Sequence, residues 1–477
     1  MMRLSQLSSV LVATTLLAGC GGDSASTSAI EIGSSPPASA GPTTTISYAP
    51  AKVTKEAFAR IDFNASGASR FECRVDGGAA EVCESPFFAF PFEPGDHRIS
   101  VTGFDAAGNA GSATTASWTV SSIFGDDADG AVHPDLIRTS VQPARVAPNS
   151  WRGIMRINCD FAHSSYDDPI VYPGQEGAAH LHRFYGHTAL DHDSTITSLF
   201  TTGESSCQGN ELNRSAYWVP ALLAPDHDPL TGQRRLDNDG QPGWKVVPAV
   251  VGNDDVAHEI FYYSAGVSDL GSIQPIPLGL KMIAGSAMGQ PGMEQDSSIV
   301  RWHCQSWESS DATNPRWSTS IPECAAPDRL RMDIFFPSCW NGTDLDSADH
   351  KSHLAYPVSA GSQTVCPSSH PVPIIRVSFH YSFGVLPDVF DPATQTSRGW
   401  RLASDHYEVS VSTPGGMSLH GDWFNAWHPD ALEAVLEGCI KSELDCHDGN
   451  LGNGFRLSGT RPGTQDEPPI YNGGMGR

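Results

Sequence analysis

Three segments of the chain have the composition of β-strands, and one has the spacing of a helix. Residues 330–336, 374–381 and 407–411 are rich in β-branched or aromatic side chains and are bounded by Pro, Gly or Asp, so each predicts a strand. A helix is predicted from Pro429, because Pro suits a first turn and apolar residues then recur at helical spacing through residue 439. Strands predominate, so the chain is expected to be mainly β with few helices.

Two β-rich regions of different size follow one another. In the first, residues 70–78 alternate and close in an Asp-Gly-Gly turn, and residues 98–102 alternate again, which predicts a small β-sandwich. The pattern FECRVDGG with a later GDHRISVTGFDAAGN resembles bacterial Ig-like modules of surface proteins, which act mostly as spacers. The second region predicts a larger β-rich domain, sandwich or jelly-roll-like. The expected limits are 46–120 for the Ig-like sandwich, 121–149 for a linker, 150–441 for the main domain and 442–477 for a Gly/Pro-rich tail.

The N-terminus has the features of an export signal. Arg3 precedes an apolar run over residues 4–17, which is too short to span a bilayer, so residues 1–19 are predicted to be a signal peptide. The sequence LAGC ending at Cys20 resembles the bacterial lipobox, which implies a lipid anchor on Cys20. Residues 20–45 are mostly small or polar and predict a disordered tether. We therefore expect a lipid-anchored protein of the bacterial cell envelope, in the outer membrane or at the cell surface.

The charge of the chain excludes some partners. With 29 Lys and Arg against 54 Asp and Glu, the formal net charge is −25, which argues against binding to a nucleic-acid backbone. The same charge disfavours anionic lipid headgroups, so membrane contact is expected through the lipid anchor only.

The cysteines indicate an oxidising compartment. Eleven are present, and Cys20 aside they form an even set without a CxxC pair, which predicts five disulfides rather than a zinc or redox motif. Eight cysteines in one domain allow 105 pairings, so the connectivity is a hypothesis. Local pairing predicts Cys73–Cys83, Cys304–Cys324, Cys339–Cys366 and Cys439–Cys446, which leaves Cys159 and Cys207 as the fifth pair.

Histidines gather in short motifs, the first of which spans residues 177–187. On a strand, residues two apart face the same side, so His180 and His182 would present two imidazoles together. Neutral imidazole is a good ligand for transition metals, so a divalent transition metal is the cofactor that this spacing suits. The alternative is that both side chains bond to backbone groups at a strand end. Arg183 follows directly and is a candidate substrate-binding residue.

Two later motifs contain the residue types of acid–base catalysis. Residues 340–357 supply Lys351 and His353 as candidate catalytic groups, with Trp340 and Tyr356 as candidate substrate-binding residues; a hydrogen-bonded structural loop is the alternative. Residues 419–427 supply the candidate catalytic pair His420 and Asp422, beside Trp423 and Trp427. Tryptophan faces stack on sugar rings, although core positions are the commoner role of such residues.

Together with SAYWVPALL from residue 215, LGLKMIAG from residue 278 and LRMDIFFPSCWNG from residue 330, these motifs resemble the Domain of Unknown Function 1996 family. The resemblance spans about 290 residues. It implies a secreted domain that in fungi accompanies WSC modules, which are associated with carbohydrate binding. It implies no established catalytic role for any residue.

The favoured hypothesis is a surface-anchored protein acting on polysaccharide or cell-wall glycan, as a carbohydrate-active enzyme with a His/Asp site. Glycoside hydrolysis and lyase elimination both remain open, because they differ in geometry rather than in residue types. A non-catalytic glycan-binding or adhesion lipoprotein and a His-ligated metal protein are the alternatives. The phosphate loop, the GxSxG elbow and the HExxH helix are absent from the sequence, which disfavours the chemistry that each of them supports.

Overall fold

The computed structural model of the protein describes residues 41–125, 130–147, 152–228, 230–249, 261–305 and 317–459. The predicted signal peptide, the Cys20 anchor and the end of the C-terminal tail lie outside the described residues. Strands predominate in the ranges that are described, and helices are few and short, so the predicted mainly β fold class is confirmed.

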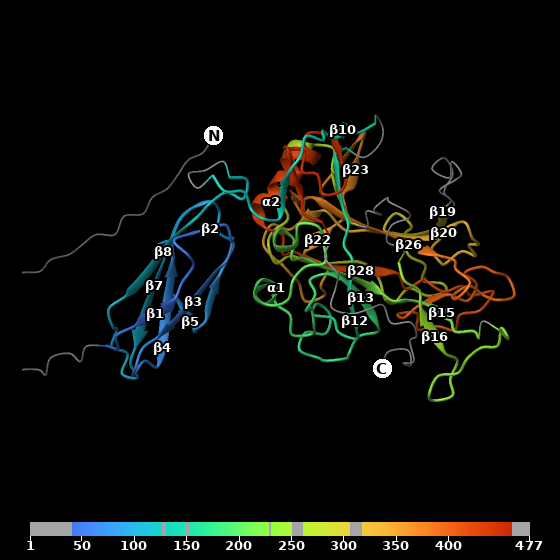
Figure 1. Ribbon diagram of the computed structural model, residues 1–477, viewed down its shortest axis with the longest axis horizontal. Coiled ribbons are helices and arrows are strands. Elements are labelled where there is room, and N and C mark those ends of the chain that lie inside the picture. Colours follow the sequence, from blue (N-terminus) through green and yellow to red (C-terminus); the bar gives the residue numbers. More distant parts are fainter. Residues whose placement is uncertain are drawn as a thin grey trace, which may run out of the picture.

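The N-terminal part consists of two sheets that enclose a core of their own (Figure 1). The core contains Ile61, Ile99 and Trp118 and the Cys73–Cys83 disulfide. One sheet has the order β1-β3-β6 and the other the order β2-β8-β7-β4-β5. The strands are β1 (Thr45–Tyr48), β2 (Val53–Thr54), β3 (Ala59–Asn64), β4 (Arg70–Val75), β5 (Glu81–Cys83), β6 (Phe87–Ala89), β7 (Gly95–Phe104) and β8 (Thr114–Val120).

The larger part is built around a seven-stranded sheet of order β10-β29-β11-β17-β26-β20-β19. Two neighbouring strands of this sheet, β26 and β20, are strands expected from the sequence, so those two predictions are confirmed. Their side chains alternate between the two faces of the sheet, as the pleat requires. The strands are β10 (Ala144–Arg145), β11 (Ile154–Ile157), β17 (Phe261–Ser264), β19 (Val300–Gln305), β20 (Arg329–Phe335), β26 (Arg376–Gly384) and β29 (Leu444–Cys446).

A five-stranded antiparallel sheet of order β12-β13-β14-β28-β18 packs against the first. Its strands are β12 (Phe161–Ser165), β13 (His182–Gly186), β14 (Ala216–Pro220), β18 (Lys281–Gly285) and β28 (His420–Phe424). Tyr217 of this sheet contacts Phe261 of the other with ring centroids 4.1 Å apart. A Cβ added at Gly421 would lie 3.0 Å from the Ile334 side chain, so the absent side chain allows the sheets to approach. The main core lies between these two sheets.

Smaller sheets and short helices surround the two large sheets. The remaining strands are β9 (Leu136–Arg138), β15 (Leu222–Pro225), β16 (Trp244–Val246), β21 (Cys339–Trp340), β22 (Leu354–Ala355), β23 (Val358–Ala360), β24 (Gln363–Val365), β25 (Val372–Pro373), β27 (Arg401–Leu402) and β30 (Phe455–Leu457). The predicted helix is present as α2 (Pro429–Val435) with a π-helical continuation (Leu436–Ile440). A second helix, α1 (Ile196–Thr201), was not predicted; Thr195 caps it in a capping box.

The predicted strand at residues 407–411 is wrong. The chain there forms a turn, with one bridge between Ser410 and Thr413. Val411 is 74% exposed, so the apolar alternation that suggested a strand has no sheet to pack against. All five predicted disulfides, in contrast, are present with the predicted pairing.

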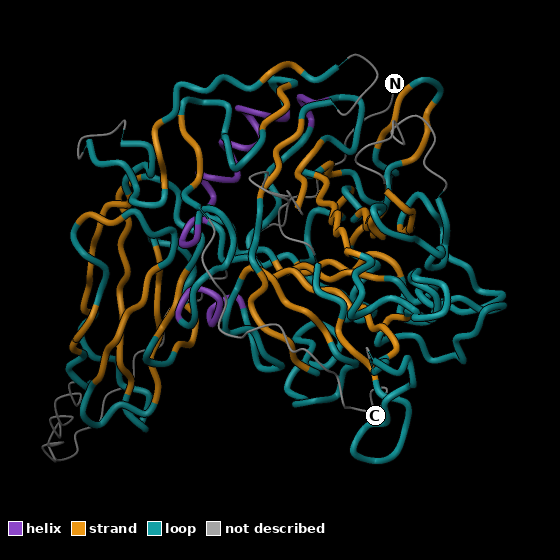
Figure 2. Tube along the Cα trace, turned by 45° about the vertical axis from the view of Figure 1, so that its right-hand side comes forward, coloured by secondary structure: helices purple, strands orange, loops and turns teal. Residues whose placement is uncertain are grey.

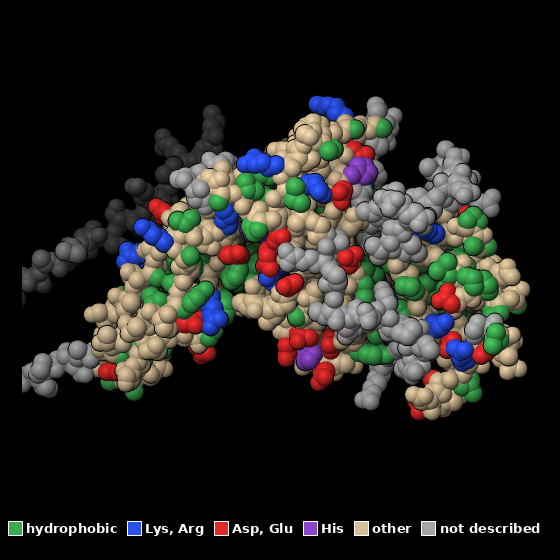
Figure 3. All heavy atoms as spheres, in the orientation of Figure 1, with side chains coloured by type: hydrophobic (Ala, Val, Ile, Leu, Met, Phe, Trp, Pro, Cys, Tyr) green, Lys and Arg blue, Asp and Glu red, His purple; other side chains and the backbone are tan. Residues whose placement is uncertain are grey.

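Both helices lie on the side of the larger part that faces the N-terminal sandwich (Figures 1 and 2). Phe200 of α1 contacts Phe58 of the sandwich, with ring centroids 5.2 Å apart. His428, directly before α2, shares a hydrogen bond of 2.8 Å with the Lys55 carbonyl. Acidic side chains lie at many places on the face shown in Figure 3, as the negative net charge leads one to expect. Within the described ranges, none of the helices has the length and apolar character needed to cross a bilayer.

Candidate functional site

Strand register places His182, His420 and Asp422 on the same face of the five-stranded sheet. Strand β14 lies between β13 and β28. Its Pro220 pairs with His182 of β13, and its Trp218 pairs with Asp422 of β28. Extending this register by two residues places Pro220 opposite His420. Directly opposed residues share a face of a sheet, so the three polar side chains point the same way. That face is the one turned away from the main core.

His180 joins the three just before β13 begins. The ring centroids of His180 and His182 are 4.2 Å apart, and those of His180 and His420 are 5.0 Å apart. Nε2 of His420 lies 3.9 Å from a carboxylate oxygen of Asp422. The predicted metal pair and the predicted catalytic pair therefore form one cluster, although about 240 residues separate them in the sequence.

Asp168 completes the cluster and was not identified from the sequence. One atom each from His180, His182 and His420 lie within 4.8 Å of one another, and so do one atom each from Asp168, His182 and Asp422. Asp168 is 3% exposed, and one of its oxygens accepts hydrogen bonds from the backbone N–H groups of Ile170 and Val171. We call Asp168, His180, His182, His420 and Asp422 the His/Asp cluster.

Backbone carbonyls fix the tautomers of two cluster histidines. Nδ1 of His182 lies 3.1 Å from the Asp167 carbonyl oxygen, and Nδ1 of His420 lies 2.8 Å from the Ser418 carbonyl oxygen. A carbonyl only accepts, so each Nδ1 carries the hydrogen and each Nε2 offers a lone pair to the cluster. This pattern of an outer hydrogen bond orienting an inner nitrogen is typical of metal-ligating histidines.

Several atoms that face the cluster have no hydrogen-bond partner. Nε2 of His180, Nε2 of His182 and both carboxylate oxygens of Asp422 are buried without one. Leaving a buried polar atom unsatisfied costs about 1–3 kcal/mol, and more when the group is charged. These four atoms belong to the two overlapping sets of residues described above, so they indicate a site built for a group that would satisfy them.

The surroundings hold the histidines in the neutral form at neutral pH. Burial lowers the pKa of His182 to about 4 and that of His420 to about 3, and it also lowers the pKa of His180. Burial, with the nearby charge of Asp168, raises the pKa of Asp422 well above its usual range. Neutral imidazoles keep their lone pairs, and a cation would return Asp422 to its ionised form.

The donor set fits a transition-metal ion. Three imidazole nitrogens and one carboxylate suit Zn, Fe, Mn, Cu or Ni, whereas Mg²⁺ and Ca²⁺ prefer sites of oxygen alone. Asp168 is near enough to serve as a fifth ligand or to bond to a metal-bound group. The cluster therefore can hold one divalent ion with its protein ligands preorganised.

Lys351 and His406 lie at the edge of the His/Asp cluster. The positive charge of Lys351 acts to lower the pKa of Asp422 and of His420, and that of His406 acts to lower the pKa of His180. Both residues are exposed, in contrast to the cluster itself. Lys351, a predicted catalytic residue, is thus near the cluster, and His406 was not identified from the sequence.

His353 does not belong to the cluster. Its Nδ1 shares a hydrogen bond of 2.9 Å with the Ser347 hydroxyl, and its Nε2 shares one of 2.8 Å with the Lys281 carbonyl. The side chain is 1% exposed, and the surrounding loop occupies both nitrogens. These bonds contradict a catalytic role and match the structural alternative.

Three of the predicted sugar-binding side chains are buried. Trp423 and Arg183 each follow a cluster residue along a strand, so each points to the opposite face, into the main core. Arg183 is 1% exposed, and its guanidinium lies over the Phe161 ring, 4.4 Å from the centroid. Trp427 is 1% exposed and donates its indole N–H to the Tyr263 hydroxyl. This burial contradicts a stacking role on a sugar for these side chains.

Trp340 and Tyr356 are partly exposed. The Trp340 indole donates to the Asp344 carbonyl, and the Tyr356 hydroxyl donates to the Phe335 carbonyl. Tyr356 lines a cavity of about 290 Å³ together with Lys351, whereas Trp340 does not. Of the predicted substrate-binding residues, Tyr356 is therefore the one that the structure places in a cavity next to Lys351.

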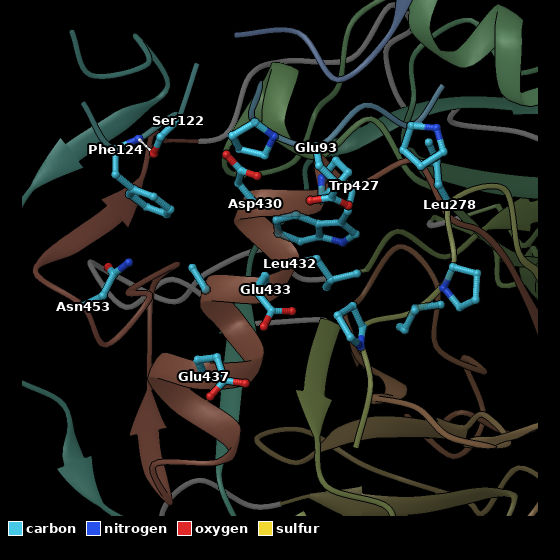
Figure 4. A pocket seen from close by; sticks show the side chains of 17 residues that line it. Glu93, Ser122, Phe124, Leu278, Trp427, Asp430, Leu432, Glu433, Glu437 and Asn453 are labelled. Carbon is cyan, nitrogen blue, oxygen red and sulfur yellow. Dashed lines mark hydrogen bonds between the residues drawn. The ribbon is translucent and has the colours of Figure 1, made fainter. Parts of the chain in front are cut away.

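A larger cavity of about 640 Å³ lies between the N-terminal sandwich and α2 (Figure 4). Asp430, Glu433 and Glu437 project from the helix along it, and Glu93 of the sandwich lies among the other lining residues. None of the His/Asp cluster residues lines this cavity, so the cluster and the cavity are separate features.

The class of protein is thus a mainly β protein with two packed sheets and a buried His/Asp cluster on the outer face of one. Residues 168–427 match the family described as Domain of unknown function (DUF1996), and the chain belongs to this family. The matched range begins at Asp168 and includes all five cluster residues.

Comparison with solved structures adds two weak similarities. One solved structure is described as "Structures of Clostridium thermocellum CbhA fibronectin(III)-like modules". It is 23% identical in sequence, and the match covers 17% of this chain and 98% of that chain with a TM-score of 0.15. Another is described as "Structural basis for the promiscuous specificity of the carbohydrate-binding modules from the beta-sandwich super family"; it is 8% identical, and the match covers 82% of this chain and 98% of that chain with a TM-score of 0.17. TM-scores this low do not define a shared fold. No curated protein matches the chain.

Proposed function

We propose that the protein binds one divalent transition-metal ion through Nε2 of His180, His182 and His420 and a carboxylate oxygen of Asp422, and that this ion is its functional centre. One observation carries the proposal: buried nitrogen and oxygen atoms without hydrogen-bond partners belong to two sets of three residues, each set with its ligand atoms within 4.8 Å of one another, and the two sets share His182. The outer hydrogen bonds of His182 and His420 already set the orientation that an ion needs.

A bound ion of this kind polarises a substrate oxygen or activates a water molecule. Around it, the chain's own residues have distinct tasks. Asp168 can accept a proton on an oxygen that its backbone hydrogen bonds leave available. Lys351 can hold a negatively charged group at the edge of the cluster. Ser418 and Asp167, through their carbonyls, keep the imidazoles from rotating.

The substrate that we propose is an extracellular polysaccharide, on the strength of the sequence motifs and of the predicted export signal. Five disulfides suit an oxidising compartment outside the cytoplasm. Binding of glycan without catalysis is the weaker alternative, because the tryptophans predicted to stack on sugar, Trp423 and Trp427, are buried. Lipid anchoring through Cys20 belongs to the same proposal.

Metal analysis of the full-length protein tests the metal centre. The protein is stripped with a chelator, loaded with Zn²⁺, desalted and measured by elemental analysis. We expect about one retained ion per chain in the wild type and well below one in His182→Ala and in His420→Ala, because loss of a ligand weakens metal binding at least tenfold. His187→Ala is the matched control, because His187 is also fully buried but its Nε2 is occupied by the Thr202 carbonyl.

A wild-type protein that retains no Zn²⁺, Mn²⁺, Fe²⁺, Cu²⁺ or Ni²⁺ after loading would overturn the proposal. Equal loss of metal in His187→Ala and His182→Ala would also contradict it, because general destabilisation would then explain both. Unchanged loading of His187→Ala supports direct ligation by the cluster.

A further inference from the structure

The loop that carries Lys351 is held in place by its own hydrogen bonds. It connects β21 to β22, and the Asp349 carboxylate accepts hydrogen bonds from the Ser347 hydroxyl and from the backbone N–H groups of Lys351 and Ser352. His353 fixes the end of the loop, as described above. The constrained loop therefore holds the exposed Lys351 in a defined position.

The Lys351 ammonium is directed at the strand next to the His/Asp cluster. It donates a hydrogen bond of 2.6 Å to the carbonyl of Gly285, the residue that lies opposite His420 across β18 and β28. One bond uses one of the three ammonium hydrogens. Lys351 forms no ion pair within the described ranges, although its positive charge acts to lower the pKa of Asp422.

The cavity of about 290 Å³ extends from Lys351 along the same face of the sheet. Ile283 and Gly285 line it, and they lie opposite Asp422 and His420 respectively. Of the other polar lining groups, the Gln295 amide donates to the carbonyls of Met417 and Leu419, and Asp296 accepts from its own turn. Lys351 is therefore the cationic group of a small cavity that adjoins the cluster.

Among the residues that line the cavity, Lys351 is the one cation and Asp296 is the one carboxylate, an oxygen of which accepts a hydrogen bond from the Ser298 backbone N–H. With an ion in place, the metal would add two positive charges that face Asp168 and Asp422. An ammonium that donates to a single backbone carbonyl can also donate to the carboxylate of a ligand. A cavity near the low end of the usual size for ligand sites, about 300–1,000 Å³, suits one sugar ring better than a long chain segment.

We infer that Lys351 and the adjoining cavity form a subsite for the carboxylate of a sugar acid, next to the metal centre. The inference rests on the proposed function and names its substrate class: a polysaccharide that contains uronic acid. Lys351 acts as a substrate-binding residue whose ammonium donates to the carboxylate, while the ring occupies the cavity beside Ile283 and Tyr356.

Calorimetric titration with glucuronate and with glucose tests the subsite, using full-length protein in the Zn²⁺-loaded and the metal-free forms. We expect the loaded wild type to bind glucuronate at least tenfold more tightly than glucose. Lys351→Met should weaken glucuronate binding about tenfold, because a charge-assisted hydrogen bond is lost. Lys351→Arg should restore most of the affinity. Lys245→Met is the matched control, because Lys245 likewise donates to one backbone carbonyl, that of Asp388, away from the cluster.

The metal content of each sample separates the two proposals. If Lys351→Met holds a full ion and binds glucuronate as the wild type does, the subsite is refuted while the metal centre stands. Equal affinity of the loaded wild type for glucuronate and glucose refutes the subsite in the same way. If the wild type takes up no ion, the metal centre fails. The metal-free titration then decides whether the Lys351-dependent preference for glucuronate exists without it; its absence refutes the subsite as well.

Discussion

Replacing Asp422 by Asn should stabilise the metal-free protein and destabilise the metal-bound protein. Without metal, the Asp422 carboxyl is 1% exposed and both oxygens lack hydrogen-bond partners, so the folded protein carries a buried ionisable group. Asn has the same size and is also polar, but it does not ionise. Because burial raises the pKa of Asp422, the folded wild type must bury a charge or take up a proton that the unfolded chain releases at neutral pH; we expect the metal-free variant, which avoids this cost, to be more stable by about 1–2 kcal/mol.

With metal bound, the wild type should be more stable than Asp422→Asn. At an ion concentration 1,000 times the dissociation constant, binding stabilises the wild type by about 4.1 kcal/mol. If Asn weakens binding about 100-fold, the same concentration stabilises the variant by only about 1.4 kcal/mol. After the advantage of the variant without metal is subtracted, a net difference of about 0.7–1.7 kcal/mol favours the wild type. A crossing of this kind requires that Asp422 be a ligand and not a structural carboxylate.

Denaturant unfolding in chelator and in excess Zn²⁺ measures both values. Asp405→Asn is the control: Asp405 is 0% exposed, but its carboxylate accepts hydrogen bonds from backbone N–H groups of Leu402 and Gly416 and from the Ser418 hydroxyl. That variant should be less stable in both conditions, by about 2–4 kcal/mol. The reasoning is refuted if Asp422→Asn destabilises the metal-free protein as Asp405→Asn does, or if Zn²⁺ stabilises Asp422→Asn as much as the wild type.

Three further predictions concern pH, the core and a disulfide. The metal-free protein should lose stability as the pH falls below 6.5, because burial holds the pKa of His182 near 4 and that of His420 near 3, so that only the unfolded chain takes up these protons. For His182 the loss is about 3 kcal/mol by pH 4, and pH-dependent unfolding of His182→Ala should show a smaller slope. Trp423→Ala should destabilise the protein by about 3–5 kcal/mol in thermal or denaturant unfolding, because the side chain is fully buried; a stable variant that merely lost sugar binding would contradict this assignment. Replacing Cys159 and Cys207 by Ala should cost about 4 kcal/mol, since their bond closes a loop with a sequence separation of 48; an unchanged denaturation midpoint would contradict it.

Local patterns predicted part of the geometry of the His/Asp cluster. The rings of His180 and His182 lie together as expected, although His180 precedes the strand, and the two-residue period of β28 places His420 and Asp422 on one face. That period also means that Trp423 cannot share a face with Asp422. Whether Trp423 or Asp422 points into the core depends on which side of this sheet is covered by the other sheet. No local pattern in the sequence contains that information.

Asp168 shows what a local pattern misses. It lies in a loop, its neighbours in the sequence carry no periodic signal, and its role depends on contacts with strands that begin 14 and about 250 residues later. For His353 the local pattern suggested a catalytic role where the structure shows a structural one. A histidine near a lysine and several carboxylates has the composition of a catalytic motif. Its two hydrogen bonds to Ser347 and Lys281 become visible only when the loop has a defined shape.

The sequence by itself indicated the mainly β class, the helix that begins at Pro429, four of the five disulfide pairs and the closeness of cluster residues two apart, because each depends on short-range spacing along the chain. The fifth disulfide, Cys159–Cys207, has a sequence separation of 48 and followed only as the pair left over. Only the tertiary structure decided that His180 and His182 meet His420 and Asp422, that Asp168 joins them, and that Trp423 is part of the core. Those outcomes depend on the order of strands within a sheet and on the packing of one sheet against another, which bring together residues far apart in the chain.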